Sequence, residues 1–136
     1  MNYQTLMGLA SELSAALGYN PAHAENLHST LRHEGFPIAL VGTPRLLSVE
    51  GEKEVERLHA IEIKLLNSRG YTPEERTAKL SLLMADAEHF AGRLAECQGV
   101  REVTIEEVAP EERTLTVAGE SAVALKVRVR SFECNA

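Results

Sequence analysis

The stretch from Thr72 to Cys97, TPEERTAKLSLLMADAEHFAGRLAEC, predicts one long amphipathic helix around which the rest of the chain is organised. Thr72 and Glu75 fit a capping box, in which each side chain accepts a hydrogen bond from the other residue's backbone N–H, and Pro73 suits the first helical position. The apolar residues recur every three or four positions, so they share one face of the helix. They are Leu80, Leu83, Met84, Ala87, Phe90, Ala91 and Leu94. This stripe needs an apolar partner surface.

The segments before this helix have the patterns of strands. Residues 36–41, FPIALV, form a short apolar run that predicts a buried strand, which residues 46–49 extend past a kink at Pro44. Residues 55–66, VERLHAIEIKLL, alternate between apolar and polar and predict a long strand with one face exposed to water. His59 falls on the apolar face, so we expect a core or border histidine with one hydrogen bond.

Strand patterns return after Gly99, which ends the helix. Residues 100–108 alternate, and residues 113–118 and 122–134 flank Gly119-Glu120-Ser121, which predicts a β-hairpin. The second arm of this hairpin has the most regular alternation in the chain.

The N-terminal part of the chain is helical in pattern. Residues 3–17 predict a helix that ends at Gly18. Asn20-Pro21 fits the N-cap and first turn of a second, shorter helix that ends at Gly35, although a loop fits almost as well. The elements together predict a single α+β domain over residues 1–136. We expect a mainly antiparallel sheet of four to five strands, with the N-terminal helix and the long helix (72–97) packed on one face.

The composition is that of an ordinary globular protein, with 44% hydrophobic and 25% charged residues. No apolar run approaches the roughly 20 residues that span a bilayer, and the N-terminus does not resemble a secretory signal, so we expect a cytoplasmic protein. The net charge of −6 disfavours sequence-independent binding to nucleic acid. Cys97 and Cys134 are far apart in sequence and are expected to be reduced thiols.

The sequence indicates no catalytic, cofactor or metal site. His23, His28 and His33 are five residues apart, whereas metal ligands on one helical face need a spacing of three or four, so we interpret them as surface histidines. Asp86 and His89 have the required spacing, but no third ligand completes a site. The chain also contains no nucleophile elbow and no glycine-rich phosphate loop.

Lys126, Arg128 and Arg130 occupy alternate positions of one predicted strand, so their side chains project from the same face. One interpretation is pairing with acids on neighbouring strands, each pair contributing about 0.2 to 1 kcal/mol. The acids available for this are Glu56, Glu62 and Glu106. The other is a patch that complements an acidic partner subunit. The first is favoured because exposed strand faces are often charged.

The order of elements resembles that of tailed-phage tail terminator and tail-completion proteins, which join head to tail. The resemblance covers Met1 to Cys134 and rests on an N-terminal amphipathic helix, FPIALV (36–41), RLHAIEIKLL (57–66), YTPEER (71–76) and ALKVRVRSFEC (124–134). It implies a virion or prophage structural subunit without enzymatic activity or cofactor. Such a subunit assembles into a ring, commonly a hexamer, that contacts tail-tube and head-completion proteins, and it is cytoplasmic until it enters the virion.

The resemblance also implies candidate subunit-interface residues. Lys126, Arg128 and Arg130 would lie near a subunit contact or the lumen. The polar segment 48–54, which contains Glu50, Glu52 and Lys53, would fold against a tube subunit as it docks. The alternative is a small cytoplasmic α+β module that binds a ligand or a protein, which would need a concave pocket with convergent polar groups.

Overall fold

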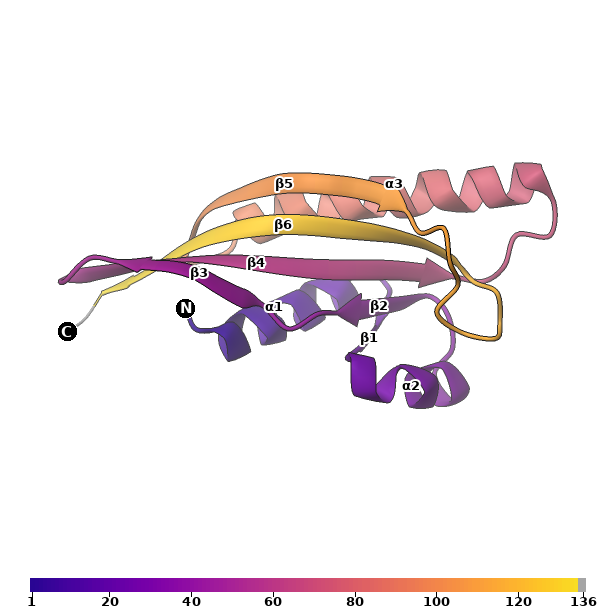
Figure 1. The fold of residues 1–136 in the computed structure, drawn as a ribbon, viewed down its shortest axis with the longest axis horizontal. Helices are drawn as coiled ribbons and strands as arrows, with labels where there is room; N and C mark the ends of the chain where they lie inside the picture. The colour runs from indigo at the N-terminus through magenta and orange to yellow at the C-terminus, as the bar shows by residue number, and fades with distance from the viewer. Residues whose placement is uncertain (135–136) are drawn as a thin grey trace.

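The computed structural model of the protein, which describes residues 1–134, is built on the pairing of two long strands, β4 (Glu54–Asn67) and β6 (Ser121–Cys134). These strands are antiparallel along their whole length, from Glu54 opposite Cys134 to Asn67 opposite Ser121. The outer side of β6 pairs with β5 (Val100–Pro110) (Figure 1). The outer side of β4 is shared by β2 (Ile38–Val41) and β3 (Arg45–Glu50).

One further strand, β1 (Asn20–Ala22), runs parallel to β2 at the sheet's edge. Within residues 1–134 the sheet therefore has six strands, in the order β1-β2-β4-β6-β5 with β3 paired to β4. The predicted α+β class is confirmed, with one strand more than the upper end of the expected number. The predicted extension of the strand at 36–41 is a separate strand, β3, because the chain kinks at Gly42–Pro44.

The helices α1 (Tyr3–Ala16) and α3 (Pro73–Ala95) cover the same face of the sheet, as predicted (Figure 1). The predicted stripe of α3 packs here, with Leu83, Ala87, Phe90, Ala91 and Leu94 buried. Alternate residues of β4 meet it, because successive strand residues point to opposite faces. Ile61, Ile63 and Leu65 of β4 share this core with Leu6 and Ala10 of α1. The sheet and the two helices are thus held by one apolar layer.

The start of α3 follows the predicted capping chemistry with one correction. Thr72 accepts a hydrogen bond from the Glu75 backbone N–H at 3.1 Å, as expected. The Glu75 carboxylate accepts from the backbone N–H of Tyr71 at 2.8 Å, and not from that of Thr72. Tyr71 lies one residue further from the helix, so the two side chains fix the loop before α3 as well as its first turn.

The predicted short helix that ends before Gly35 is present, but its predicted start at Asn20-Pro21 is wrong. These residues form β1, because the Asn20 backbone N–H donates to Pro37 O at 2.9 Å and draws the chain alongside β2. The helix starts later, as a 3₁₀ turn (Ala24–Asn26) followed by α2 (Leu27–His33). It packs on the opposite sheet face from α1 and α3, over a small apolar cluster at one end of the sheet. This cluster contains Ala22, Leu27, Ile38, Leu66 and Ala122.

The predicted hairpin with arms at 113–118 and 122–134 is also wrong. The antiparallel partner of β6 is β5, and residues 111–120 form the loop between them. Glu120 organises this loop, because its buried carboxylate accepts hydrogen bonds from the backbone N–H groups of Leu115 and Thr116, at 3.0 and 2.7 Å. These bonds satisfy backbone donors that a strand would have used in a ladder.

Candidate functional site

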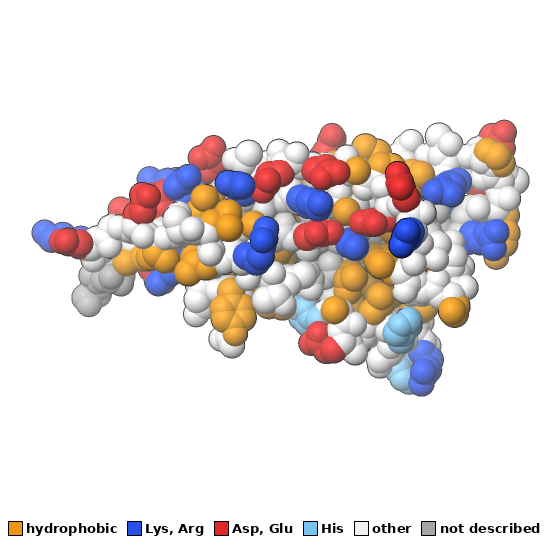
Figure 2. Space-filling view, viewed as in Figure 1, with side chains coloured by type: hydrophobic (Ala, Val, Ile, Leu, Met, Phe, Trp, Pro, Cys, Tyr) orange, Lys and Arg blue, Asp and Glu red, His pale blue; other side chains and the backbone are white. Residues whose placement is uncertain are grey.

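The sheet face opposite α1 and α3, here called the open face, carries charged side chains of both signs. In Figure 2 acidic and basic groups alternate over β4, β6 and β5 on this face. It is formed by the residues of β4 and β6 that point away from the core, including the predicted stripe Lys126, Arg128 and Arg130. At the end next to β2, α2 and Leu115 of the loop between β5 and β6 cover the open face. The remainder is accessible as a flat charged surface.

Each residue of the basic stripe makes an ion pair within its own chain. Arg128 Nε lies 2.9 Å from Glu106, and Arg130 lies 3.0 Å from Glu56. These two partners are among those predicted, so this interpretation is confirmed for both arginines. Lys126 differs, since it lies 3.6 Å from Glu107. All these side chains are partly exposed, so each pair contributes at most about 1 kcal/mol to stability. A role of the stripe in subunit contact stays a prediction.

The strand β3 forms a rim of the sheet with exposed apolar side chains. Within the described chain, β3 pairs with β4 alone, so its outer backbone edge has no strand beside it. Leu46, Leu47 and Val49 are 53%, 41% and 52% exposed. The reason is visible in Figure 1, where the β3–β4 hairpin projects beyond the ends of α1 and α3, at left. Toward the hairpin tip, therefore, no helix formed by residues 1–134 lies over the apolar face of β3.

Sequence reasoning placed these leucines in a strand but did not identify them as a surface. Their exposure depends on how far the helices extend over the strands. The helix α3 of 23 residues is about 35 Å long, and its first turns extend past the end of β4 at right in Figure 1. A helix displaced toward that end leaves the opposite end of the sheet uncovered. The spacing of apolar residues in the sequence does not predict this displacement.

The hairpin tip contains the remaining predicted interface residues, Glu50, Glu52 and Lys53. Glu52 and Lys53 lie in the exposed turn after Gly51, whose φ of +97° suits glycine. Glu50 lies directly opposite Glu56 on β4, a like-charge juxtaposition that is unfavourable. Glu56 is itself paired with Arg130, whereas Glu50 makes no ion pair with any other residue in the range 1–134. Glu50 is therefore a carboxylate that a neighbouring cation would stabilise.

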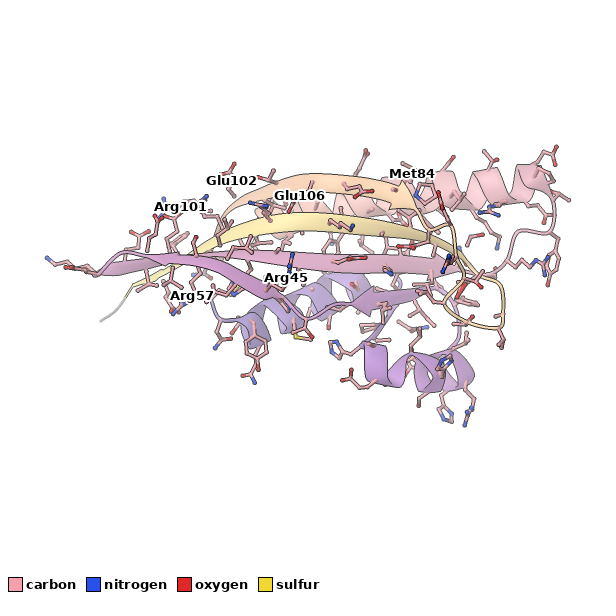
Figure 3. All side chains as sticks on the ribbon, viewed as in Figure 1. Arg45, Arg57, Met84, Arg101, Glu102 and Glu106 are labelled. Carbon is pink, nitrogen blue, oxygen red and sulfur yellow. The ribbon has the colours of Figure 1, made fainter. Side chains whose placement is uncertain are left out.

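At the other end of β3, Arg45 lies on the open face. Its side chain extends over β4 (Figure 3) and lines a shallow hollow of about 370 Å³ with Gly42, Ala60, Glu62 and Lys126. The small side chain of Ala60, opposite Arg45, creates this space. Arg45 forms no ion pair with another described residue, although both Glu62 and Glu106 also line the hollow. Arg45 is not among the residues that the sequence pattern predicted as a site.

A second hollow, also of about 370 Å³, lies at the opposite end of the molecule. The loop before α3 contributes Arg69 and Gly70, α3 contributes Arg76, and the loop between β5 and β6 contributes Glu112 and Glu120. The charges are mixed, and the Glu120 carboxylate is already occupied by backbone N–H groups. The arrangement can hold a small polar molecule by its two guanidinium groups, and it contains no nucleophile paired with a base.

The contacts of the histidines at 23, 28 and 33 and of Asp86 are those of structural or surface residues and not of metal ligands. His28 and His33 are exposed, as predicted, whereas His23 is half-buried, and its Nδ1–H donates a hydrogen bond to Val41 O at 3.2 Å. Asp86 accepts a hydrogen bond from the Tyr19 hydroxyl, which accounts for its carboxylate without a metal. Among residues 1–134, no group of three or more His, Cys, Asp and Glu side chains is arranged to hold a metal ion.

His59 is buried on the core face, as predicted. The hydrogen bond predicted for its side chain is not found among the described residues. Its side chain is 2% exposed, and its Nδ1 has no hydrogen-bond partner among the described residues. Ser131 is buried on the same face, and its Oγ also lacks a partner in the described chain. Burial lowers the pKa of His59, and the positive charges of the N-terminus and Arg57 lower it further. The neutral imidazole is therefore the form that this site favours.

Cys97 is a free thiol at the end of α3, where its Sγ–H donates to Arg93 O at 3.3 Å. The side chain of Cys134 falls outside the described part of the structure. Burial and the nearby carboxylates of Glu96 and Glu12 raise the pKa of the Cys97 thiol, which lowers its reactivity. As for membranes, none of the helices formed by residues 1–134 combines the length and apolar character needed to cross one.

No protein-family model matches the chain, and no curated protein matches it.

Proposed function

We propose that the protein is a structural subunit that acts by assembly, of the tail-terminator type: several copies form a ring at the head–tail junction of a tailed phage or prophage. The observation that carries this proposal is the rim strand β3, which presents Leu46, Leu47 and Val49 to solvent beside a backbone edge that pairs with no strand formed by residues 1–134. In this role the protein needs no cofactor and performs no catalysis.

Covering the exposed side chains of β3 would contribute free energy to association. A fully buried leucine or valine side chain contributes about 1.5 to 3 kcal/mol, so covering three that are about half exposed contributes on the order of 3 kcal/mol. A partner strand would add backbone hydrogen bonds along the rim. Exposed edges with apolar side chains are generally avoided in monomeric proteins, which favours a rim that is covered in the functional state.

The open face supports the same proposal in a different way. Its ion pairs, such as Arg128 with Glu106, hold charged groups in fixed positions on a flat sheet. A fixed pattern of charges gives register and orientation to a contact rather than strong affinity. We expect this face to meet a neighbouring subunit or to line the lumen of the ring, with tail-tube and head-completion proteins as the other partners.

The test is light scattering on the purified protein over a wide concentration range, alone and with the tail-tube protein of the same phage or prophage, followed by negative-stain imaging. A closed ring near six copies, formed alone or on the tube protein, would support the proposal. Leu47→Lys should prevent this ring. The matched control is Leu82→Lys, at a leucine of α3 that is 54% exposed against 41% for Leu47, and it should leave the ring intact. A protein that stays monomeric under both conditions would contradict the proposal.

The hollow lined by Arg69 and Arg76 favours a second candidate, a small cytoplasmic module that binds a ligand. A thermal-shift screen of small polar molecules tests it. A compound that raises the midpoint of wild type and not of Arg76→Ala would favour this function, and the absence of any such compound would weigh against it.

A further inference from the structure

The segment RLLSVE of β3 is self-complementary if it pairs with itself in the antiparallel sense. Two copies related by a twofold axis through the centre of the strand place Arg45 opposite Glu50 of the second copy and Leu46 opposite Val49 of the second copy. Opposite residues of an antiparallel pair must lie on the same face of the sheet. Arg45 and Glu50 are five residues apart, and in a regular strand such residues lie on opposite faces.

A register shift in β3 removes this obstacle. The strand pairs Leu46 with His59 and Ser48 with Leu58, so Leu47 is an extra residue. As a result Arg45 lies opposite Ala60 and Glu50 lies opposite Glu56, two positions of β4 that share the open face. Leu46 and Val49 likewise lie opposite His59 and Arg57, which share the other face. Both pairs of the two-copy arrangement therefore meet the same-face requirement.

The charges and the exposed side chains suit this arrangement. Neither Arg45 nor Glu50 has an ion-pair partner within the described chain, and Glu50 also opposes Glu56. Arg45 of a second copy would place a cation beside this carboxylate, and the twofold axis would make the contact twice. Leu46 and Val49, each about half exposed, would cover one another on the opposite face.

The outline of the sheet leaves room for one strand beside β3. β1 lies outside β2, whereas β3 has no strand outside it within residues 1–134. The rim is thus set back at β3, and a second copy's β3 can lie there in line with β1. We propose that the free protein forms a twofold dimer in which β3 pairs antiparallel with β3 of a second copy, joining the two sheets into one.

This inference rests on the proposed function only in taking β3 as the association edge. Each β3 has a single outer edge, so the dimer and a ring contact through β3 exclude one another. The dimer is then the state of the free protein, and it dissociates when the subunit enters the ring.

The test uses Arg45→Glu and Glu50→Arg, measured by light scattering and sedimentation. Wild type should have the mass of two copies. Each variant alone places like charges opposite one another twice, and its dissociation constant should rise by at least about tenfold. Mixed in equal amounts, the two variants should form a heterodimer of near wild-type affinity, since both contacts are then between opposite charges. Arg32→Glu, at an exposed arginine of α2, is the control and should dimerise normally.

Wild type that is monomeric at every concentration, or that forms only rings, would overturn the inference. So would variants that fail to associate on mixing while circular dichroism shows both to be folded. The two proposals fail separately. Rings without a dimer leave the proposed function standing, and a dimer that never forms rings with tail-tube protein leaves this inference standing.

Discussion

The hydroxyl of Tyr19 lies 2.5 Å from a carboxylate oxygen of Asp86, and this hydrogen bond joins the turn after α1 to the middle of α3. Burial raises the pKa of Tyr19, and its hydrogen bond and proximity to the Asp86 carboxylate raise it further. The phenol therefore stays a donor throughout the usual pH range. The bond ties the chain that leaves α1 to α3, so it helps to fix the position of the two helices that cover one sheet face.

Tyr19→Phe should destabilise the protein by about 1.5 to 3 kcal/mol, because it removes a hydrogen bond to a charged group and leaves the Asp86 carboxylate partly buried without this donor. The measurement is the free energy of unfolding in urea at pH 7. Tyr3→Phe, at a half-exposed position at the start of α1, is the control and should change stability by less than about 0.5 kcal/mol. Equal effects of both changes would contradict this role of Tyr19.

Leu83→Asp should unfold the domain, whereas Leu82→Asp should not. Leu83 is 0% exposed and Leu82 is 54% exposed, although they are adjacent in α3. A carboxylate at position 83 would be buried in the apolar layer without a partner. Circular dichroism and thermal melting of the two variants would show the difference, and a folded Leu83→Asp protein would contradict the assignment of the buried face.

The stability of the protein should fall as the pH is lowered from 7.5 to 5.5. The pKa of His59 is lower in the folded state than its ordinary value of 6.5, so below that value the unfolded state binds the proton first. The loss approaches about 1.4 kcal/mol per pH unit for one proton. Glu133, whose pKa Arg57 and the N-terminus lower, titrates at more acidic pH and does not contribute in this window.

His59→Leu should abolish most of this pH dependence, since it removes the titrating group and leaves a side chain of similar size in the core. Unfolding free energies at several pH values for both proteins provide the measurement. His28→Leu, at an exposed histidine of α2, should retain the wild-type slope. An unchanged slope in His59→Leu would mean that another group is responsible.

Arg128→Glu should weaken assembly and leave the monomer folded. The half-exposed pair with Glu106 contributes little to stability, so the loss should stay near or below about 1 kcal/mol. The charge pattern of the open face changes sign at this position. Arg93→Glu, on the exposed side of α3, is the matched control. Negative-stain counts of rings would test the prediction, and undiminished assembly in Arg128→Glu would exclude a role for the stripe.

The parts of the fold that the sequence predicted well are those in which one local pattern decides the structure. The cap at Thr72, the stripe around Phe90 and the alternation of β4 each follow from spacing alone. The errors occurred where a hydrogen bond that no repeat pattern records decides the structure. Asn20 forms a strand because it pairs beside β2, and residues 113–118 form a loop because Glu120 binds their backbone.

In the candidate site, too, local patterns were predicted correctly and features that depend on pairing between strands were not. Alternation correctly placed Lys126, Arg128 and Arg130 on one face and suggested acidic neighbours for them. The register of β5 was not predictable, because its shifts near Arg101 and Glu106 depend on the pairing with β6, and so Lys126 meets Glu107. The exposure of Leu46 depends on where the helices end over the sheet, which no pattern within β3 records.

The central claim is that the protein associates through β3, and amide hydrogen exchange tests it most directly. Exchange would be measured at residues 45–50 in the associated species and in a solution diluted until light scattering gives the mass of one copy. The account predicts strong slowing at β3 on association, with unchanged exchange in the exposed first turns of α3. Equal exchange at β3 in both states would contradict the claim and would move the association surface elsewhere.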